Sequence, residues 1–68
     1  MTNVINLKVG DKIQHIRTGL IGIIENIGSP TIKYKVIDIG NSKMGLKIGD
    51  IQKTNIYSIG TLYELIED

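Results

Sequence analysis

The sequence predicts a small all-β barrel of five to six short antiparallel strands, and three observations support this class. Isoleucine is the dominant apolar residue, whereas alanine, phenylalanine and tryptophan are absent. β-Branched side chains pack well on pleated sheets and slightly disfavour helices. Glycines recur at short intervals, as is typical of turns between short strands. A chain of 68 residues suits one domain with a modest core, so residues 1–68 are interpreted as a single barrel.

Composition and charge exclude several classes of function. Cysteine is absent, so the chain has neither a disulfide framework nor a thiolate metal site, and a single histidine gives little support for any other metal site. We therefore predict no cofactor and no metal. The N-terminal MTNVINLKVG is not a signal peptide and no window is long enough to span a membrane, which predicts a cytoplasmic protein without membrane contact. The net charge of +1 is far below that of a dedicated non-specific nucleic-acid binder.

The first hairpin is predicted over residues 12–27. Residues 1–6 form a lead-in segment, and Gly10 and Asp11 then make a tight turn, because glycine tolerates positive φ and an aspartate side chain binds nearby backbone amides. Two strands follow, over residues 12–18 and 21–27.

His15, Gly19 and Gly22 are expected to shape this hairpin. Ile13 and His15 share one face of the first strand while Ile16 lies on the other, which indicates a bulge or bend near His15. Gly19 and Gly22 give the chain two permissive points at which to reverse direction. His15 is interpreted as a structural residue hydrogen-bonded against the hairpin.

The third strand is predicted over residues 31–39, after a turn that contains Pro30. Its residues alternate: one face carries lysines, and the other carries Ile32, Tyr34 and Val36. Ile37 and Ile39 break this parity, which suggests a far end that is buried on both sides or twisted at a barrel corner.

The second half of the chain repeats the pattern of strands and turns. Residues 40–42 form a turn, and strands are predicted over residues 43–48 and 51–57, separated by a turn at Gly49 and Asp50. Residues 58–61 read as a short turn or a single 3₁₀ turn. Residues 61–67 are interpreted as a closing strand, with a short helix as the competing interpretation, because Leu62, Leu65 and Ile66 have helical spacing. Whether residues 43–57 form an ordered hairpin or a mobile loop is left open.

One short sequence occurs twice: LKVGD over residues 7–11 and LKIGD over residues 46–50. The similarity ends after five or six residues, whereas true structural repeats continue for a whole supersecondary unit. We interpret the two copies as similar turns and not as a repeat.

The opening motif LKVGDxxxHxxxG resembles a known class of small barrels through Leu7, Lys8, Val9, Gly10, Asp11, His15 and Gly19. It is similar to the Tudor-like RNA polymerase-interacting domain of the CarD and transcription-repair coupling factor families, and to the C-terminal Tudor-like domain of UvrD/PcrA-type helicases. The resemblance implies an SH3-like or Tudor-like barrel that contacts RNA polymerase through protein–protein contacts. KOW domains, which often bind RNA, are also similar over residues 10–13.

A weaker resemblance lies near the C-terminus. Residues 54–57, Thr-Asn-Ile-Tyr, followed by residues 62–66, look like the Val-Gln-Ile-Tyr strand and the closing strand of type II dihydrofolate reductases, which are tetramers of SH3-like barrels. Asn55 stands where that family has glutamine, and no lysine is present at His15 or Ile16, where that family has its pore lysine. An enzyme of this type is the second alternative function.

The candidate site residues are mainly lysines. No catalytic residues are predicted, because the carboxylates are scattered and no nucleophile–base order or phosphate-binding loop is present. The three tyrosines are expected to pack in the core with their hydroxyls at the surface. An alternative binding mode adds a partner strand to an exposed edge at residues 43–48. The predicted partner-binding residues are Lys33, Lys35, Lys43, Lys47, Lys53 and Tyr57.

These observations lead to a main hypothesis and one further alternative. The main hypothesis is a non-catalytic protein-binding module or small regulator that contacts RNA polymerase or another host protein, with a phage-encoded modulator as one form of it. The alternative is a KOW-like nucleic-acid-binding protein, for which the lysines would meet phosphates. The sequence leaves the oligomeric state open, homo-oligomers included.

Overall fold

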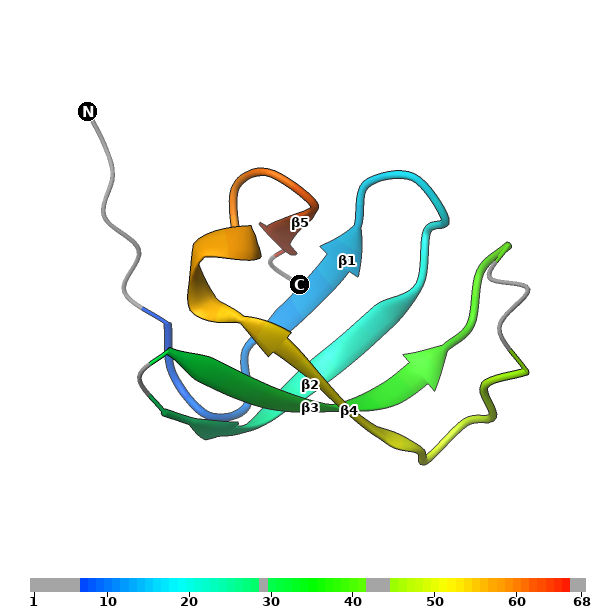
Figure 1. Ribbon diagram of the computed structural model, residues 1–68. Coiled ribbons are helices and arrows are strands. Elements are labelled where there is room, and N and C mark those ends of the chain that lie inside the picture. Colours follow the sequence, from blue (N-terminus) through cyan, green and yellow to red (C-terminus); the bar gives the residue numbers. More distant parts are fainter. Residues whose placement is uncertain (1–6, 29, 42–44, 67–68) are drawn as a thin grey trace.

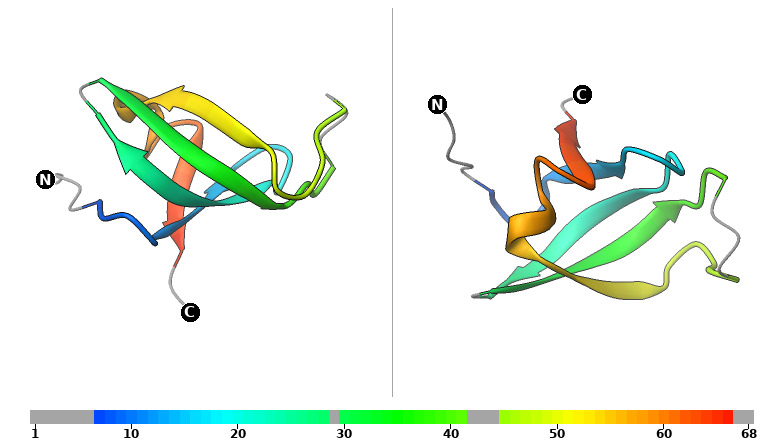
Figure 2. Two further views of the ribbon diagram at one scale, coloured as in Figure 1. Left: turned by 90° about the horizontal axis from the view of Figure 1, so that it is seen from below. Right: turned by 45° about the horizontal axis from the view of Figure 1, so that its top comes forward.

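The computed structural model describes residues 7–28, 30–41 and 45–66. Its elements are β1 (Lys12–His15), β2 (Ile21–Ile27), β3 (Thr31–Asp38), β4 (Ile51–Asn55), the 3₁₀ helix η1 (Ile56–Ser58) and β5 (Tyr63–Ile66). The strands pair antiparallel in the order β4-β3-β2-β1-β5, and the sheet curls into a half-barrel compatible with an SH3-like fold (Figures 1 and 2). The predicted all-β class is confirmed. The predicted lead-in, residues 1–6, lies outside the described residues.

Strand β1 ends three residues earlier than predicted, at His15. The Nδ1 atom of His15 accepts hydrogen bonds from the amides of Arg17 (3.1 Å) and Thr18 (3.3 Å), and the His15 carbonyl accepts one from the Gly19 amide (2.9 Å). These bonds hold residues 16–18 in a turn, so the chain does not continue as a strand. The bend therefore follows His15, and Ile16 is 52 % exposed.

Strand β3 confirms the predicted alternation. Ile32, Tyr34 and Val36 are buried, whereas Lys33 and Lys35 are exposed. A strand with one face on the core and one in solvent shows this period of two. The pairing of β2 with β3 shifts register between Ile21 and Gly22 and again between Ile24 and Asn26. Irregularities of this kind increase the local twist of a sheet.

The two copies of the LKxGD sequence fold into the same turn. In the first, the Lys8 amide donates to Asp11 Oδ2 (2.9 Å) and the Asp11 amide donates to the Lys8 carbonyl (3.0 Å). In the second, Lys47 and Asp50 make the same two bonds at 2.9 and 3.0 Å. The glycine of each turn has positive φ, +98° at Gly10 and +96° at Gly49.

Each LKxGD turn also binds the neighbouring strand in the same way. The Gly10 amide donates to the Ile24 carbonyl of β2, and the Ile24 amide donates to the Asp11 carbonyl. The Gly49 amide donates to the Val36 carbonyl of β3, and the Val36 amide donates to the Asp50 carbonyl. The two turns thus set the registers of β1 and β4 against the central β2–β3 hairpin.

The strand predicted over residues 43–48 is wrong for its described part. Residues 45–47 have no regular structure, and Ile48 and Gly49 form the turn described above. Because the Asp50 carboxylate and carbonyl satisfy the Lys47 and Val36 amides, this segment is held as a turn instead of a ladder. Lys43 and Met44 lie outside the described residues.

Strand β4 ends at Asn55 and not at the predicted residue 57, because a cap begins there. The Asn55 Oδ1 atom accepts the Tyr57 amide (2.8 Å) and caps η1, so the 3₁₀ turn begins two residues before the predicted range 58–61 and overlaps it at Ser58. Gly60 then reverses the chain with φ of +99°. Residues 63–66 form β5, which confirms the strand interpretation over the helix.

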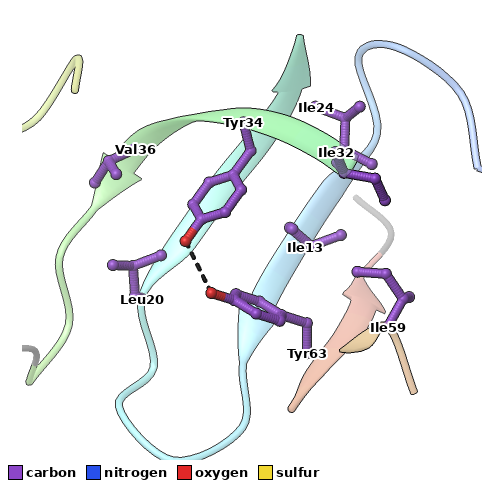
Figure 3. Packing of buried hydrophobic residues seen from close by; sticks show 8 residues of the cluster. All are labelled: Ile13, Leu20, Ile24, Ile32, Tyr34, Val36, Ile59 and Tyr63. Atoms are coloured by element: carbon purple, nitrogen blue, oxygen red, sulfur yellow. Dashed lines mark hydrogen bonds between the residues drawn. The ribbon is translucent and has the colours of Figure 1, made fainter. Parts of the chain in front are cut away.

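The core lies inside the curl of the sheet (Figure 3). Two buried tyrosines occupy its centre: the hydroxyls of Tyr34 and Tyr63 are 2.8 Å apart and hydrogen-bonded, and the His15 ring meets the Tyr63 ring edge-on with centroids 4.9 Å apart. The prediction of tyrosine hydroxyls at the surface is wrong for this pair, because each hydroxyl satisfies the other in the interior. The buried side chains are Ile13, Leu20, Ile24, Ile32, Tyr34, Val36, Ile59 and Tyr63.

The tyrosine pair predicts a loss of stability at alkaline pH. Burial, reinforced by the hydrogen bond between Tyr34 and Tyr63, raises the pKa of Tyr34 far above its ordinary value of about 10. The folded state therefore holds this proton more tightly than the unfolded state. The resulting stability is complete below about pH 10 and falls by about 1.4 kcal/mol per pH unit above it.

Urea unfolding at about pH 9 and about pH 11 measures this slope. Tyr34→Phe should make the slope shallower, whereas Tyr57→Phe, which removes a hydroxyl from a side chain that is 77 % exposed, should leave it unchanged. An equal slope in all three proteins would show that the buried pair does not couple to folding.

Candidate binding surface on the lysine face of the sheet

The outer face of the half-barrel brings three of the predicted lysines together. Lys33 of β3 stands directly opposite Lys53 of β4, and Lys35 stands opposite Ile51. Residues directly opposite in neighbouring strands project from the same face of a sheet. On the other side of β3, Lys35 is opposite Ile23. We call this surface the lysine face and define it by Ile23, Lys33, Lys35, Ile51 and Lys53.

The lysines of this face lie close together because of the pairing pattern. The Val36 amide donates to the Asp50 carbonyl and the Ile56 amide to the Pro30 carbonyl, so even-numbered residues of β4 exchange hydrogen bonds with β3. Lys33 and Lys53 consequently form a non-hydrogen-bonded pair, in which side chains approach most closely. Like charges in directly opposite positions destabilise a sheet. An anionic partner would remove this repulsion.

No carboxylate is a direct cross-strand partner of these lysines. The direct cross-strand partners of Lys33 are Asn26 and Lys53, and those of Lys35 are Ile23 and Ile51. The side chains of Lys33, Lys35 and Lys53 are exposed. These three lysines therefore present positive charge to solvent without a negative group in their direct cross-strand pairs.

The lysine face also has an apolar part. Ile51 is 49 % exposed and Ile23 is partly buried, and the two flank Lys35 on either side. The same row continues across β1 and β5, where Lys12 pairs with both Ile23 and Ile66. Alternating isoleucine and lysine side chains therefore cross the whole sheet. Sequence reasoning missed Ile51 and Lys12, because only the strand register places them beside Lys35.

Two other predicted binding residues lie away from this face. Lys47 belongs to the turn before β4, and Tyr57 lies in η1 with 77 % of its surface exposed, which contradicts the prediction that it packs in the core. Tyr57 is exposed because η1, which Asn55 caps, carries the chain off the sheet. Lys43 lies outside the described residues.

The residues of the opening motif shape turns and loops of the fold. Gly10 and Asp11 form the first LKxGD turn, His15 accepts two loop amides, and Gly19 lies in the same loop with φ of +79°. Gly22 is not a turn residue: it is buried within β2, where the Tyr34 ring lies against its Cα. The sequence offered one signal for this role: Gly22 stands within an apolar strand, and a glycine in that position often marks a close approach by another group.

The carboxylates of the turns are already engaged by the backbone. Asp11, Asp38 and Asp50 accept the amides of Lys8, Gly40 and Lys47, respectively. Among residues 7–28, 30–41 and 45–66, no group of three or more histidine, cysteine, aspartate or glutamate side chains could hold a metal ion. Within the same ranges, no helix is long and apolar enough to cross a bilayer.

Comparison with known proteins gives no relative: no family model, no curated protein and no solved structure matches this chain.

Proposed function

We propose that the protein is a non-catalytic binding module that holds an acidic surface of a protein partner on its lysine face. The observation that carries this proposal is the Lys33–Lys53 pair: two exposed lysines directly opposite each other, with no acidic residue among their cross-strand partners. Repulsion in the free protein and attraction to a carboxylate both favour the bound state.

The apolar part of the lysine face favours a protein over a nucleic acid. Ile51 lies beside Lys35 and is about half exposed, so it can contact an apolar side chain of the partner. Proteins that bind single-stranded nucleic acids stack bases on aromatic side chains. In the described part of the lysine face, no aromatic side chain is present.

RNA polymerase is the specific partner that we propose. The support is the similarity of LKVGDxxxHxxxG to the polymerase-interacting domains named above, together with an all-β half-barrel of suitable topology. A small regulator, including one encoded by a phage, could occupy a host protein in this way.

A nucleic-acid-binding role of the KOW type is the second candidate, and the same Lys33–Lys53 pair favours it. Phosphates would neutralise the two lysines, and binding would release counterions. Affinity should then fall steeply between low and moderate salt, whereas a contact that includes Ile51 would keep part of its affinity.

Charge reversal on the lysine face tests the main proposal. In an affinity pull-down from bacterial lysate, Lys33→Glu/Lys53→Glu should recover at least about tenfold less of the main protein partner than the parent protein, because both lysines then repel an acidic surface. The matched control is Lys8→Glu/Lys47→Glu, which makes the same change in net charge on the two exposed turns. The control should recover the partner normally.

Nuclease treatment separates the two candidates. A partner protein that survives nuclease and depends on Lys33 and Lys53 supports the adaptor role, and its polymerase version is contradicted if no polymerase subunit is recovered. Recovery that disappears with nuclease supports the nucleic-acid role. Equal recovery by both double variants would contradict a function of the lysine face in either case.

A further inference from the structure

Strand β4 is an edge of the sheet with unused backbone groups. It lies at one end of the strand order and pairs only with β3 (Figure 1). Because its even-numbered residues face β3, the N–H and C=O groups of Ile51, Lys53 and Asn55 point away from the sheet. The Asn55 carbonyl accepts the first bond of η1, and within the described part of the chain no hydrogen bond is found to the other five groups. They form a template for one further strand.

The opposite edge of the sheet is less available. The Ile16 amide of the neighbouring chain segment donates to the Leu62 carbonyl, so the even-numbered residues of β5 direct their backbone groups toward β1. The backbone groups that point away from β1 are therefore those of Tyr63 and Leu65. The Tyr63 carbonyl already accepts the Gly60 amide at 2.6 Å. The chain's own loop thus covers part of the β5 edge, whereas among the described residues no loop bonds to the outer backbone groups of Ile51 and Lys53 in β4. The edge predicted at residues 43–48 is replaced by β4, since the described residues of that segment form no strand.

The charge of the β4 edge selects its occupant. In the register that pairs all five residues of two antiparallel β4 strands, Lys53 would stand opposite Lys53 of a second copy, with Lys33 alongside in each sheet. Such like-charge pairs are unfavourable, and lysines on edge strands are a common protection against self-association. An extended segment that places a carboxylate opposite Lys53 would instead form a favourable cross-strand pair.

We propose that β4 binds an extended acidic segment of the partner protein as an added strand, with a glutamate or aspartate opposite Lys53. The inference rests on the proposed function and specifies how the partner is held: backbone hydrogen bonds to Ile51, Lys53 and the Asn55 amide supply the attachment, and the lysine face supplies the preference for acidic sequence. Residues of the added strand that face the core side meet Gln52 and Thr54, which are partly buried.

The test uses a blocked peptide of alternating glutamate and valine, about seven residues long, and two N-methylated forms of it. Residues opposite Ile51 and Lys53 exchange hydrogen bonds with β4, so a glutamate opposite Lys53 must use its own amide. N-methylation of the glutamate amides should therefore weaken binding at least about tenfold, while N-methylation of the valine amides should not. The net charge is the same in the two methylated peptides.

Hydrogen exchange gives a second readout on the folded protein. With saturating unmethylated peptide, the amides of Ile51, Lys53 and Asn55 should exchange at least about tenfold more slowly than in the free protein. The amides of Gln52 and Thr54, which face β3, serve as internal controls and should change little.

The outcomes separate this inference from the proposed function. Equal binding of both methylated peptides, with unchanged exchange at Ile51, Lys53 and Asn55, would overturn strand addition while leaving the lysine face as a charged binding surface. Failure of every peptide to bind would also overturn strand addition. Loss of the proposed function itself would appear separately, as a pull-down that does not respond to Lys33→Glu/Lys53→Glu.

Discussion

Gly40→Ala is expected to lower the free energy of unfolding by about 3 kcal/mol or more, a large part of the roughly 3 to 10 kcal/mol available to a domain of this size. A Cβ atom at this position would lie 2.6 Å from the carbonyl carbon of Gly19, 2.8 Å from the Leu20 nitrogen and closer still to the Thr18 carbonyl oxygen. All three are backbone atoms, so no side-chain rotation relieves the overlap. Gly40 also has φ of +55°, which favours glycine.

The close approach at Gly40 joins two distant loops. The Asn41 amide donates to the Thr18 carbonyl at 2.7 Å, so the loop after β3 packs on the loop between β1 and β2. Urea unfolding of the purified variant gives the loss of stability directly.

Gly45→Ala is the matched control for Gly40→Ala. It places alanine at φ of +75°, and no atom of the described residues beyond its chain neighbours lies within 4 Å of the new Cβ. It should cost only about 1 kcal/mol, from backbone conformation alone. Equal losses in the two variants would show that the contact between loops does not contribute.

Gly22→Ala is expected to lower the free energy of unfolding by about 2 kcal/mol, because it overpacks the core. The new Cβ would lie 3.0 Å from Cγ of Tyr34 and closer still to Cδ2. The Tyr34 ring cannot easily move, since β3 is held between β2 and β4 and the hydroxyl is bonded to Tyr63.

A double-mutant cycle isolates this contact. Gly22→Ala should cost much less in a Tyr34→Leu background, because the ring that it strikes is absent, and the coupling energy should be about 1 kcal/mol or more. In a Tyr34→Phe background the ring remains, so the full cost of Gly22→Ala should remain. Additive losses in the leucine background would place the cost of Gly22→Ala elsewhere, for example in the strand backbone.

Local features of the sequence were sufficient to predict the β class, the alternation of β3 and the two LKxGD turns. Each depends on neighbouring residues only: the period of two along a strand, and a glycine with positive φ beside an aspartate that binds a nearby amide. The interpretation of β5 as a strand was also correct. The predicted strand ends at residues 18 and 57 were wrong, because side-chain acceptors on His15 and Asn55 compete with the ladder for backbone amides.

The remaining features depend on which strands pair and in which register, and these were decided by the tertiary structure. From the sequence alone, Gly22 was interpreted as a turn residue. In the structure it lies within β2, and the Tyr34 ring of the next strand leaves no room for a Cβ atom there. The lysine pair and its isoleucine neighbours exist only because β3 and β4 align Lys33 with Lys53 and Lys35 with Ile51. A shift of one residue would turn each of these side chains to the other face. The sequence by itself therefore determined the kind of elements and several of their turns, whereas long-range register determined the core contacts and the surface available for binding.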